Sequence, residues 1–515
     1  MNPIDVEVFR HRFQSVAEEM GVVLRQAAFS ANIKERLDFS CAITDRDGFM
    51  VAQAAHIPVH LGSCHLTARF ILGHLELAEG DVICLNDPFR GGTHLPDVTF
   101  FMPVFLDGES TASFGVISRA HHADIGGGVP GSMGNFDEIF KEGLIIPPVK
   151  IVVGGVLNQD VLSMILANVR TPEERQGDLM AQLASVRRGA ERLKETAVRY
   201  GRDLLGLAGT ALMDRSERSM RQLIQTIPNG AYSFRDVLDE RDGPVIEVCL
   251  TVDQDHIEID FEGSSPALDQ ALNAHEAITL SCVFYAIRCL ASEEVPTNSG
   301  ILRPLKLTLP NRTIVSAEHP SAVAAGNVET SQRIVDVLFG ALAQALPDRI
   351  PAASQGTMNN VSFGGSLPES GLFTYFETLA GGIGAGPSGD GASGLHSHMT
   401  NTRNTPVEAL ELSYPLRVRR YELRSGSGGD GANKGGEGIV REYESLLPMT
   451  LSLLTTRRAT NPWGLRGGGE GAAGNNILIR ADEETSLPSC GSIQLAPGDR
   501  VRITTPGGGG FLTAD

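Results

Sequence analysis

The sequence predicts an α+β protein built in several sections, and three observations support that fold class. Apolar residues recur at helical spacing near the N-terminus, short apolar segments typical of strands follow, and glycine becomes frequent beyond residue 351. A chain of 515 residues is long enough for roughly two to four domains. We expect an α+β unit at residues 1–150, a helical and α+β section at 151–350, and a Gly-rich, β-rich section at 351–515.

The first section is predicted to open with an amphipathic helix. Apolar residues between Ile4 and Ser30 recur every three or four positions, so that one stripe of the helix faces the core. Residues 45–48, with the sequence DRDG, have the composition of a hairpin turn. Strands are predicted at Phe39–Thr44, Val82–Leu85, Val98–Phe105 and Ala112–Ser118, each bounded by Gly, Asp or Pro.

The second section is predicted to begin with long helices. Thr171 is expected to cap a helix that has Pro172 in its first turn, and Leu204–Ile227 adds another helix. Residues 229–262 alternate between apolar and polar positions as strands do. Two further helices are predicted, at about Ala271–Leu290 and Glu329–Leu346.

The third section differs in composition. Many of the 58 glycines lie here, in runs such as GSGGDGANKGGEG, and short apolar segments are interleaved with them. This regular interleaving predicts strands joined by tight glycine turns rather than flexible linkers. Strands are expected at residues 373–380, 415–423, 449–456 and 500–505.

Charge and cysteine content exclude some classes of partner and site. The formal net charge of −19 makes a nucleic-acid backbone or an anionic membrane an unsuitable partner. The seven cysteines are scattered without CxxC spacing, which indicates a reducing compartment rather than a disulfide framework. The N-terminus lacks the pattern of a signal peptide, and no apolar run is long enough to cross a bilayer, so we expect a cytoplasmic protein.

Polar residues gather at two neighbouring predicted turns. His94 and Asp97 follow a Gly-Gly pair, and His121, His122 and Asp124 follow the next predicted strand. Imidazoles mixed with carboxylates suit a divalent metal such as Zn, Mn or Fe. Any one of these histidines, taken alone, fits a solvated turn equally well. Five such residues on two neighbouring turns favour a site.

Other polar residues remain open on sequence grounds. Asp38 begins a predicted strand and is either solvent-facing or part of a site. His60 fits a histidine in the core or in a loop. Glu142 is either a hydrogen-bond acceptor that supports a residue of a site or a residue at the end of a helix. His396 and His398 are two residues apart, so they either share a metal or lie in an exposed loop.

The sequence contains no phosphate-binding loop of the GxxxxGK[ST] type. Two segments, 384–389 and 469–474, match GxGxxG by spelling, but neither lies between a predicted strand and helix. A GxSxG nucleophile motif in a strand-to-helix turn is also missing. The chain therefore has no recognisable nucleotide site or serine-hydrolase triad.

Several longer motifs together resemble those of the hydantoinase B/5-oxoprolinase family, which includes N-methylhydantoinase and ketone-carboxylase subunits. The resemblance covers nearly the whole chain. It rests on the segments NIKERLDFSCAI, HIPVHLGS, NDPFRGGTHLPDV, AHHADIGG, EGLIIPPVK, SAVAAGNVETSQRI, NTRNTPVEALE and TPGGGGF.

This resemblance implies a metal-dependent activity that needs a partner. Members act with a hydantoinase-A-like subunit, or a fused equivalent, that binds ATP and Mg²⁺, so a hetero-oligomer such as (αβ)₂ is expected. The family's carboxylate–histidine cluster corresponds to Asp38, His94, Asp97 and His121 as catalytic and metal-binding residues. His122 stands where relatives often carry an aromatic residue, so it and Asp124 are less certain ligands.

The implied function is that of the B-type subunit of an ATP-dependent amidohydrolase. Its small-molecule substrate would be a cyclic amide such as a lactam, 5-oxoproline or a hydantoin, phosphorylated by the partner before the ring opens. The resemblance leaves two alternatives open. One is a subunit of an ATP-dependent ketone carboxylase, and the other is a non-catalytic subunit that stabilises the ATP-binding partner.

Overall fold

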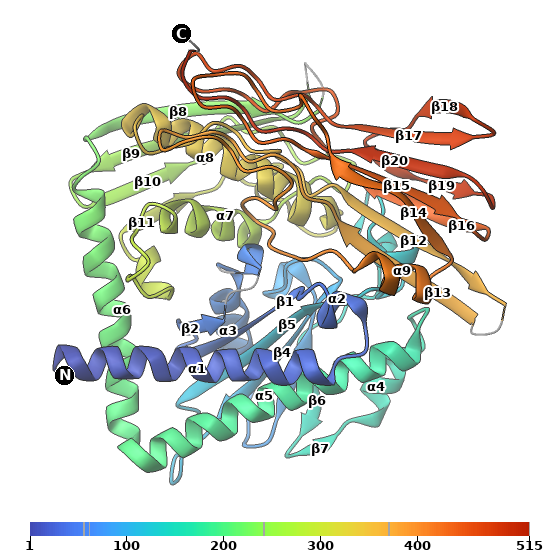
Figure 1. The fold of residues 1–515 in the computed structure, drawn as a ribbon. Helices are drawn as coiled ribbons and strands as arrows, with labels where there is room; N and C mark the ends of the chain where they lie inside the picture. Colours follow the sequence, from blue (N-terminus) through green and yellow to red (C-terminus); the bar gives the residue numbers. More distant parts are fainter. Residues whose placement is uncertain (55–56, 61, 240–242, 369–370, 514–515) are drawn as a thin grey trace.

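The computed structural model describes residues 1–513 apart from 55–56, 61, 240–242 and 369–370, and it confirms the predicted α+β fold class (Figure 1). The first sheet has the order β2-β1-β5-β4-β3-β6-β7, and every neighbouring pair is antiparallel. Its strands are β1 (Phe39–Asp45), β2 (Met50–Ala54), β3 (Val82–Leu85), β4 (Asp97–Val104), β5 (Phe114–His121), β6 (Val149–Val153) and β7 (Val156–Leu157).

Long helices cover one face of this sheet. Helix α1 (Pro3–Ala27) packs against α5 (Pro172–Tyr200), which in turn packs on β4 and β5. Their apolar stripes meet the sheet in one core that contains Phe13, Phe100 and Leu193. Helix α6 then leads from this layer to the second sheet (Figure 1). The other helices of this part are α2 (Ala31–Lys34), α3 (Ser63–His74), α4 (Gln159–Leu166) and α6 (Arg202–Ile224).

The predicted cap of α5 is wrong, although the helix begins where the sequence places it. The Thr171 side chain makes no capping hydrogen bond to the helix, and its backbone angles of φ −124° and ψ 69° are not those of an extended capping residue. Pro172 occupies the first turn as predicted, and Glu173 and Glu174 lie beside the positive end of the helix dipole.

The second sheet has the order β11-β10-β9-β8, and its strands β8 and β9 pack against the buried helix α8, on which helix α7 packs in turn. Helix α7 begins later than predicted, whereas the helical segment that contains α8 begins earlier, since residues 324–325 are already helical. His275 is extended, so α7 starts after it, and a π-helical turn at Gly326–Thr330 precedes the regular part of α8. The elements are β8 (Gly230–Val237), β9 (Val245–Asp253), β10 (His256–Asp260), β11 (Leu305–Thr308), α7 (Glu276–Arg288) and α8 (Ser331–Ala345).

The C-terminal part is β-rich, as predicted, and contains two antiparallel sheets with orders β13-β12-β16-β19 and β14-β15-β20-β17-β18. Its glycine loops pack on one another: Gly508 N–H donates to Gly436 O at 2.8 Å, and a Cβ on Gly436 would lie 2.0 Å from Ala392 O. The elements are β12 (Asn360–Leu367), β13 (Gly371–Thr378), α9 (Val407–Ser413), β14 (Leu416–Leu423), β15 (Ile439–Ser445), β16 (Met449–Leu454), β17 (Asn475–Arg480), β18 (Glu483–Ser486), β19 (Cys490–Leu495) and β20 (Arg500–Thr504).

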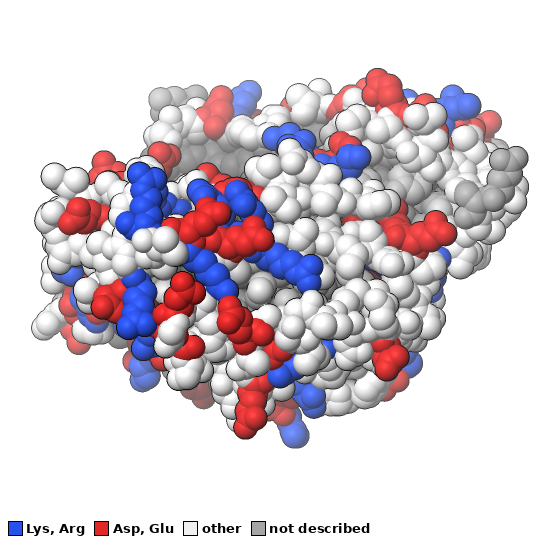
Figure 2. All heavy atoms as spheres, turned by 90° about the horizontal axis from the view of Figure 1, so that it is seen from below, with Lys and Arg blue, Asp and Glu red and all other residues white. Residues whose placement is uncertain are grey.

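The negative charge of the chain is not gathered into one patch on the helical face. Figure 2 shows acidic and basic side chains interspersed there. Glu19 on α1, for example, pairs with Arg188 at 2.5 Å and with Arg192 at 2.8 Å on α5. No helix of the described residues is long and apolar enough to cross a membrane. All seven cysteines lie within those residues, and none of them is in a disulfide.

Hydrophobic cores link the sections that the sequence suggested. One core joins Phe13 and Val98 to Leu212, and another joins Ile117 to Leu338. A third core is confined to the C-terminal sheets. The division at residues 150 and 350 stays a prediction.

Candidate metal centre

Three of the predicted site residues lie at the same edge of the first sheet. Asp97 is the first residue of β4 and His121 is the last residue of β5, and the two are paired in the ladder. Asp38 immediately precedes β1, and its carbonyl accepts a hydrogen bond of 3.0 Å from His121 N–H. Because β1, β5 and β4 are neighbours, the antiparallel register brings these residues together.

The loop before β4 adds His94 to this edge. Gly91 has φ +94°, and a Cβ on Gly92 would lie 2.6 Å from Asn86 O, so both glycines are needed for the turn. A hydrogen bond of 3.0 Å from Asp97 N–H to His94 O closes the loop. His94 Nε2 then lies 3.2 Å from Asp97 Oδ1, and His121 Nδ1 lies 3.4 Å from the same oxygen.

These three side chains fit a divalent cation. One ligand atom from each of His94, Asp97 and His121 lies within 4.8 Å of the others, and all three residues are buried. Both ring nitrogens of His94, and Nε2 of His121, have no hydrogen-bond partner among the described residues. Buried polar atoms normally have a partner, and two imidazoles with one carboxylate suit Zn²⁺ or a similar ion.

The electrostatics of the cluster favour a bound cation. Burial alone would raise the pKa of Asp97, but the surrounding His94, His60 and His121 rings hold that pKa well below its usual range. Burial also lowers the pKa of His121. Asp97 is therefore ionised and His121 neutral near pH 7, which are the protonation states that metal ligands require.

His60 is a site residue that sequence reasoning missed. Its Nε2 lies 3.3 Å from Asp97 Oδ2, and its Nδ1 lies 2.9 Å from Ser40 Oγ. The Thr93 hydroxyl donates to the same Asp97 oxygen at 2.7 Å. His60 and Thr93 thus fix the carboxylate from the side opposite His94. The HIPVHLGS segment was the only signal for His60, and its His56 and Leu61 lie outside the described residues.

Asp38 lies beside the cluster, whereas His122 and Asp124 contact other parts of the chain. Asp38 lines the same small cavity as Asp97 and His121. The Gln182 amide donates to two carbonyls, so its oxygen accepts from His122 Nε2–H at 2.8 Å, and this contact ties β5 to α5. Asp124 forms an ion pair of 2.7 Å with Arg170.

The remaining open residues also lie apart from the cluster's ligand atoms. Glu142 is fully buried, and its Oε1 accepts from Val323 N–H at 2.9 Å and Ala324 N–H at 2.8 Å. Burial raises the pKa of Glu142 to about 8. His398 Nε2 lies 3.4 Å from Asp336 Oδ1, while neither ring nitrogen of His396 has a partner among the described residues.

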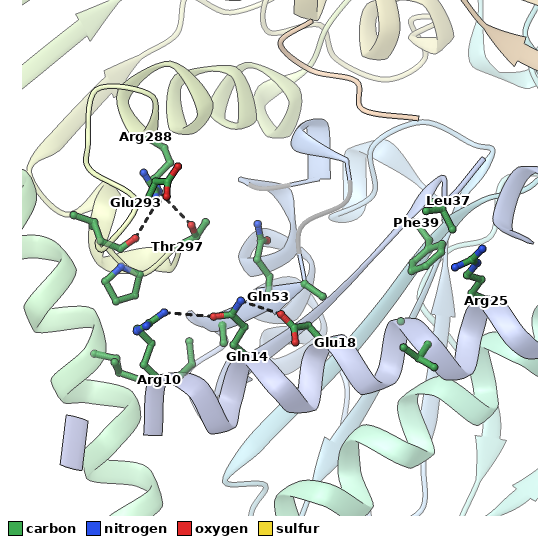
Figure 3. Close-up of a pocket in the computed structure, with 18 residues that line it drawn as sticks. Arg10, Gln14, Glu18, Arg25, Leu37, Phe39, Gln53, Arg288, Glu293 and Thr297 are labelled. Carbon is green, nitrogen blue, oxygen red and sulfur yellow. Dashed lines mark hydrogen bonds between the residues drawn. The ribbon is translucent and has the colours of Figure 1, made fainter. Parts of the chain in front are cut away.

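The cavity at the cluster is small, and larger pockets lie around it. It has a volume of about 20 Å³, whereas an open pocket of about 630 Å³ is lined by Leu37 and Phe39, the neighbours of Asp38. Figure 3 shows that polar side chains reach this pocket from both sides, with Gln53 between them. They include Arg10, Gln14 and Glu18 of α1 and, opposite them, Arg288, Glu293 and Thr297.

A second open pocket shares a loop with the cluster. It has a volume of about 920 Å³, and its lining includes Pro88, Phe89 and Gly91 from the loop that also carries His94. His275 lines it too, and its Nε2 lies 2.5 Å from Thr93 O. Both open pockets are within the usual range of small-molecule sites.

The fold and the cluster together define an α+β protein with a buried His/Asp site suited to a divalent cation. The chain belongs to the Hydantoinase B/oxoprolinase family, whose model matches residues 2–513. It is 42% identical to an uncharacterized protein of Methanocaldococcus jannaschii over 99% of this chain and 91% of that protein. It is 39% identical to 5-oxoprolinase 1 of Arabidopsis thaliana over 99% of this chain but only 42% of that protein.

Solved structures agree with this assignment. The chain superimposes on the ATP-dependent caprolactamase of Pseudomonas jessenii with a TM-score of 0.92 and 28% identity, covering 100% of this chain and 91% of that chain. An acetone carboxylase has the same fold, with a TM-score of 0.90, 18% identity and coverage of 99% and 76%. The chain thus spans less than half of the plant 5-oxoprolinase but most of the caprolactamase chain.

Proposed function

We propose that this chain is the B-type subunit of an ATP-dependent amidohydrolase that opens a cyclic amide ring. The observation that carries the proposal is the buried group His94, Asp97 and His121, in which one ligand atom from each residue lies within 4.8 Å of the others. A relative named 5-oxoprolinase and a structural neighbour named caprolactamase both indicate a cyclic amide as the substrate class.

The ATP-binding function is assigned to a partner. The sequence has no phosphate-binding loop, and the 5-oxoprolinase relative is more than twice as long as this chain. A hydantoinase-A-like subunit would therefore bind ATP and Mg²⁺ and phosphorylate the amide oxygen, in a hetero-oligomer such as (αβ)₂. Phosphorylation activates an amide carbon that resonance otherwise protects from water.

Ring opening would then take place at the cluster. A bound divalent ion there lowers the pKa of water and polarises a carbonyl oxygen. The side chains of His94, Asp97 and His121 would hold that ion, while Asp38, in the same cavity, is placed to take a proton from water as general base. In the net reaction a C–O bond forms, the C–N bond breaks and the nitrogen takes up a proton, while the cyclic amide, ATP and two waters yield the ring-opened acid, ADP and phosphate.

Reconstitution with the partner tests the proposal. The complex should release ADP and a ring-opened product from at least one lactam, 5-oxoproline or hydantoin, measured by a coupled ADP assay and mass spectrometry. A parallel reaction with a ketone and bicarbonate tests the carboxylase alternative. Carboxylated ketone without ring-opened product would overturn the hydrolase assignment.

Cluster variants separate a catalytic chain from a merely structural one. His94→Ala and Asp97→Ala should abolish ring opening, because losing an activated nucleophile costs several kcal/mol in the barrier, or orders of magnitude in rate. Both variants should still bind the partner in size-exclusion chromatography, as should the exposed control His11→Ala. Near-normal turnover of either cluster variant would favour the non-catalytic alternative.

A further inference from the structure

The GNVET segment forms a buried π-helical turn directly before α8. All of Gly326–Thr330 is buried, and a Cβ on Gly326 would lie only 1.8 Å from Asn273 O. Glu329 holds the turn from one side, because its Oε1 accepts from Met358 N–H at 3.0 Å and from Asn360 Nδ2 at 2.9 Å. The turn is therefore fixed in place, and π-helical turns are often found at functional sites.

Glu142 fixes the chain that enters this turn. It accepts from the N–H groups of Val323 and Ala324, and Val323 O accepts from Asn327 N–H at 3.2 Å. The Asn327 carbonyl accepts from the Ser331 hydroxyl at 2.7 Å. Both backbone groups of Asn327 are thus engaged within the turn, which leaves its side chain to face other partners.

The Asn327 side chain lies at the candidate metal centre. The residue is 3% exposed, and it lines the cavity of about 20 Å³ together with Asp38, Asp97 and His121. Its Oδ1 is buried and has no hydrogen-bond partner among the described residues. Leaving such an acceptor unsatisfied costs about 1–3 kcal/mol, so its retention indicates a partner that binds there.

Two other polar groups of the cavity already have partners. The hydroxyls of Thr378 and Thr402 lie 2.5 Å apart and form a hydrogen bond with each other. The cavity has about the volume that one water molecule needs. An amide oxygen cannot act as a general base at neutral pH, but it can accept a hydrogen bond and thereby orient a water.

We propose that Asn327 is a positioning residue whose Oδ1 accepts a hydrogen bond from the water that attacks the substrate at the His94–Asp97–His121 cluster. The inference rests on the proposed hydrolase function and adds a residue to it from the far side of the cavity. A hydrogen bond to Asn327 Oδ1 would fix the direction in which the lone pair of the water points. Because a misoriented nucleophile reacts much more slowly, losing this hydrogen bond should lower the rate.

The kinetic test compares Asn327→Leu with Asn327→Asp in the complex with the ATP-binding partner. Leu removes the acceptor at similar volume, so kcat should fall about 100-fold, while KM stays within about threefold because substrate contacts are unchanged. Asp keeps an acceptor oxygen at the same place and should recover at least about a tenth of the wild-type kcat. Asn168→Leu, the same change at an exposed position, is the control.

Two further measurements do not depend on turnover. A high-resolution crystal structure of the Zn²⁺-loaded wild-type chain should show a solvent molecule about 2.6–3.2 Å from Asn327 Oδ1, absent in Asn327→Leu. Calorimetry should give Zn²⁺ affinities for the wild-type chain and for Asn327→Leu that agree within about threefold. The melting temperature of Asn327→Leu should not fall, because the substitution removes an unsatisfied polar group.

The outcomes separate this inference from the proposed function. Unchanged kcat in Asn327→Leu, or no solvent at Oδ1 in the wild type, overturns the positioning role. A large loss of Zn²⁺ affinity also overturns it, because Asn327 would then be a metal ligand. If the wild-type complex opens no cyclic amide, the proposed function fails, and the crystal structure still decides whether a water is held by Asn327.

Discussion

Asp97 shows how a single residue depends on the groups behind it. One of its oxygens faces His94 and His121, whereas the other is held by His60 and the Thr93 hydroxyl. The second pair of contacts orients the carboxylate toward the candidate metal position. Groups that orient a metal ligand in this way commonly change metal affinity about 10–100-fold when they are removed.

We therefore expect His60→Leu to weaken Zn²⁺ binding about 10–100-fold without unfolding the chain. The variant removes one partner of Asp97 but leaves the His94 and His121 rings in place. Affinity is measured by competition with a chromophoric chelator, and circular dichroism checks the fold. His11→Leu, at an exposed position of α1, should bind Zn²⁺ as the wild type does. Equal affinities for both variants would show that His60 has no orienting role.

The sequence identified the residues of the cluster better than the groups that support them. His94, Asp97 and His121 stood out because imidazoles and carboxylates were concentrated at two predicted turns. His60 and Asn327 were missed because each is an isolated polar residue within an apolar or small-residue segment. Their proximity to Asp97 depends on the packing of distant segments, and local sequence patterns carry no information on that packing.

At the level of elements, the turn at Gly326–Thr330 depends on the close approach of two backbones. We expect Gly326→Ala to lower the melting temperature and reduce turnover, because its Cβ would lie 1.8 Å from Asn273 O and the turn must shift. The expected cost in unfolding free energy is at least about 1–3 kcal/mol, measured by urea denaturation.

Gly206→Ala is the matched control. This glycine lies within α6, and a Cβ there meets no atom within 4 Å among the described residues. Replacing a helical glycine by alanine at such a site should stabilise the protein by roughly 0.5–1 kcal/mol. If both substitutions had the same effect, close packing at Gly326 would not be the cause.

The bounds of an element were predicted best where turn residues border it on both sides. The bounds Val82–Leu85 are those of β3, because this apolar segment is bordered by turn residues on both sides. The start of α7 was placed too early, since the apolar pattern continues through the extended His275, whereas the helical segment that contains α8 begins at residue 324, before the predicted start at Glu329. A local pattern does not distinguish a regular helix from a π-helical turn, because tertiary contacts of Glu329 and Gly326 determine that geometry.

On the scale of the whole molecule, the candidate site is formed where the first sheet meets the C-terminal part. His121 stacks on Phe376 with ring centroids 4.7 Å apart. The fully buried Arg36 donates to Phe376 O at 2.8 Å and to the Thr378 hydroxyl at 3.1 Å. Asp38, two residues after Arg36, is thereby held against β13. Sequence reasoning placed these parts in different sections and could not predict this contact.

The buried ionisable groups also determine how stability depends on pH. Burial lowers the pKa of His65, His122, His275 and His396 to about 4, below the ordinary histidine value of 6.5. The folded state binds fewer protons at these positions than the unfolded state, so stability rises as pH increases from about 4 to 6.5. Burial raises the pKa of Glu142 to about 8 and that of Glu329 to about 7, above the ordinary glutamate value of 4.5. The stability that these two protonated carboxyls contribute is fully present below pH 4.5 and is lost as the pH rises to 7–8.

We therefore expect the metal-free chain to be most stable near pH 6.5, with a decline toward pH 8 that Glu142→Gln reduces. Glutamine does not ionise but keeps an oxygen that can accept from the N–H groups of Val323 and Ala324. Glu142 is ionised in the unfolded state over this range but is still largely protonated in the folded state. Raising the pH from 6.5 to 8 should therefore lower the free energy of unfolding by about 2 kcal/mol. Urea denaturation at a series of pH values, with chelator present, measures this loss. The exposed Glu483→Gln should keep the wild-type decline, and an unchanged decline in Glu142→Gln would show that this carboxyl is not the group that titrates.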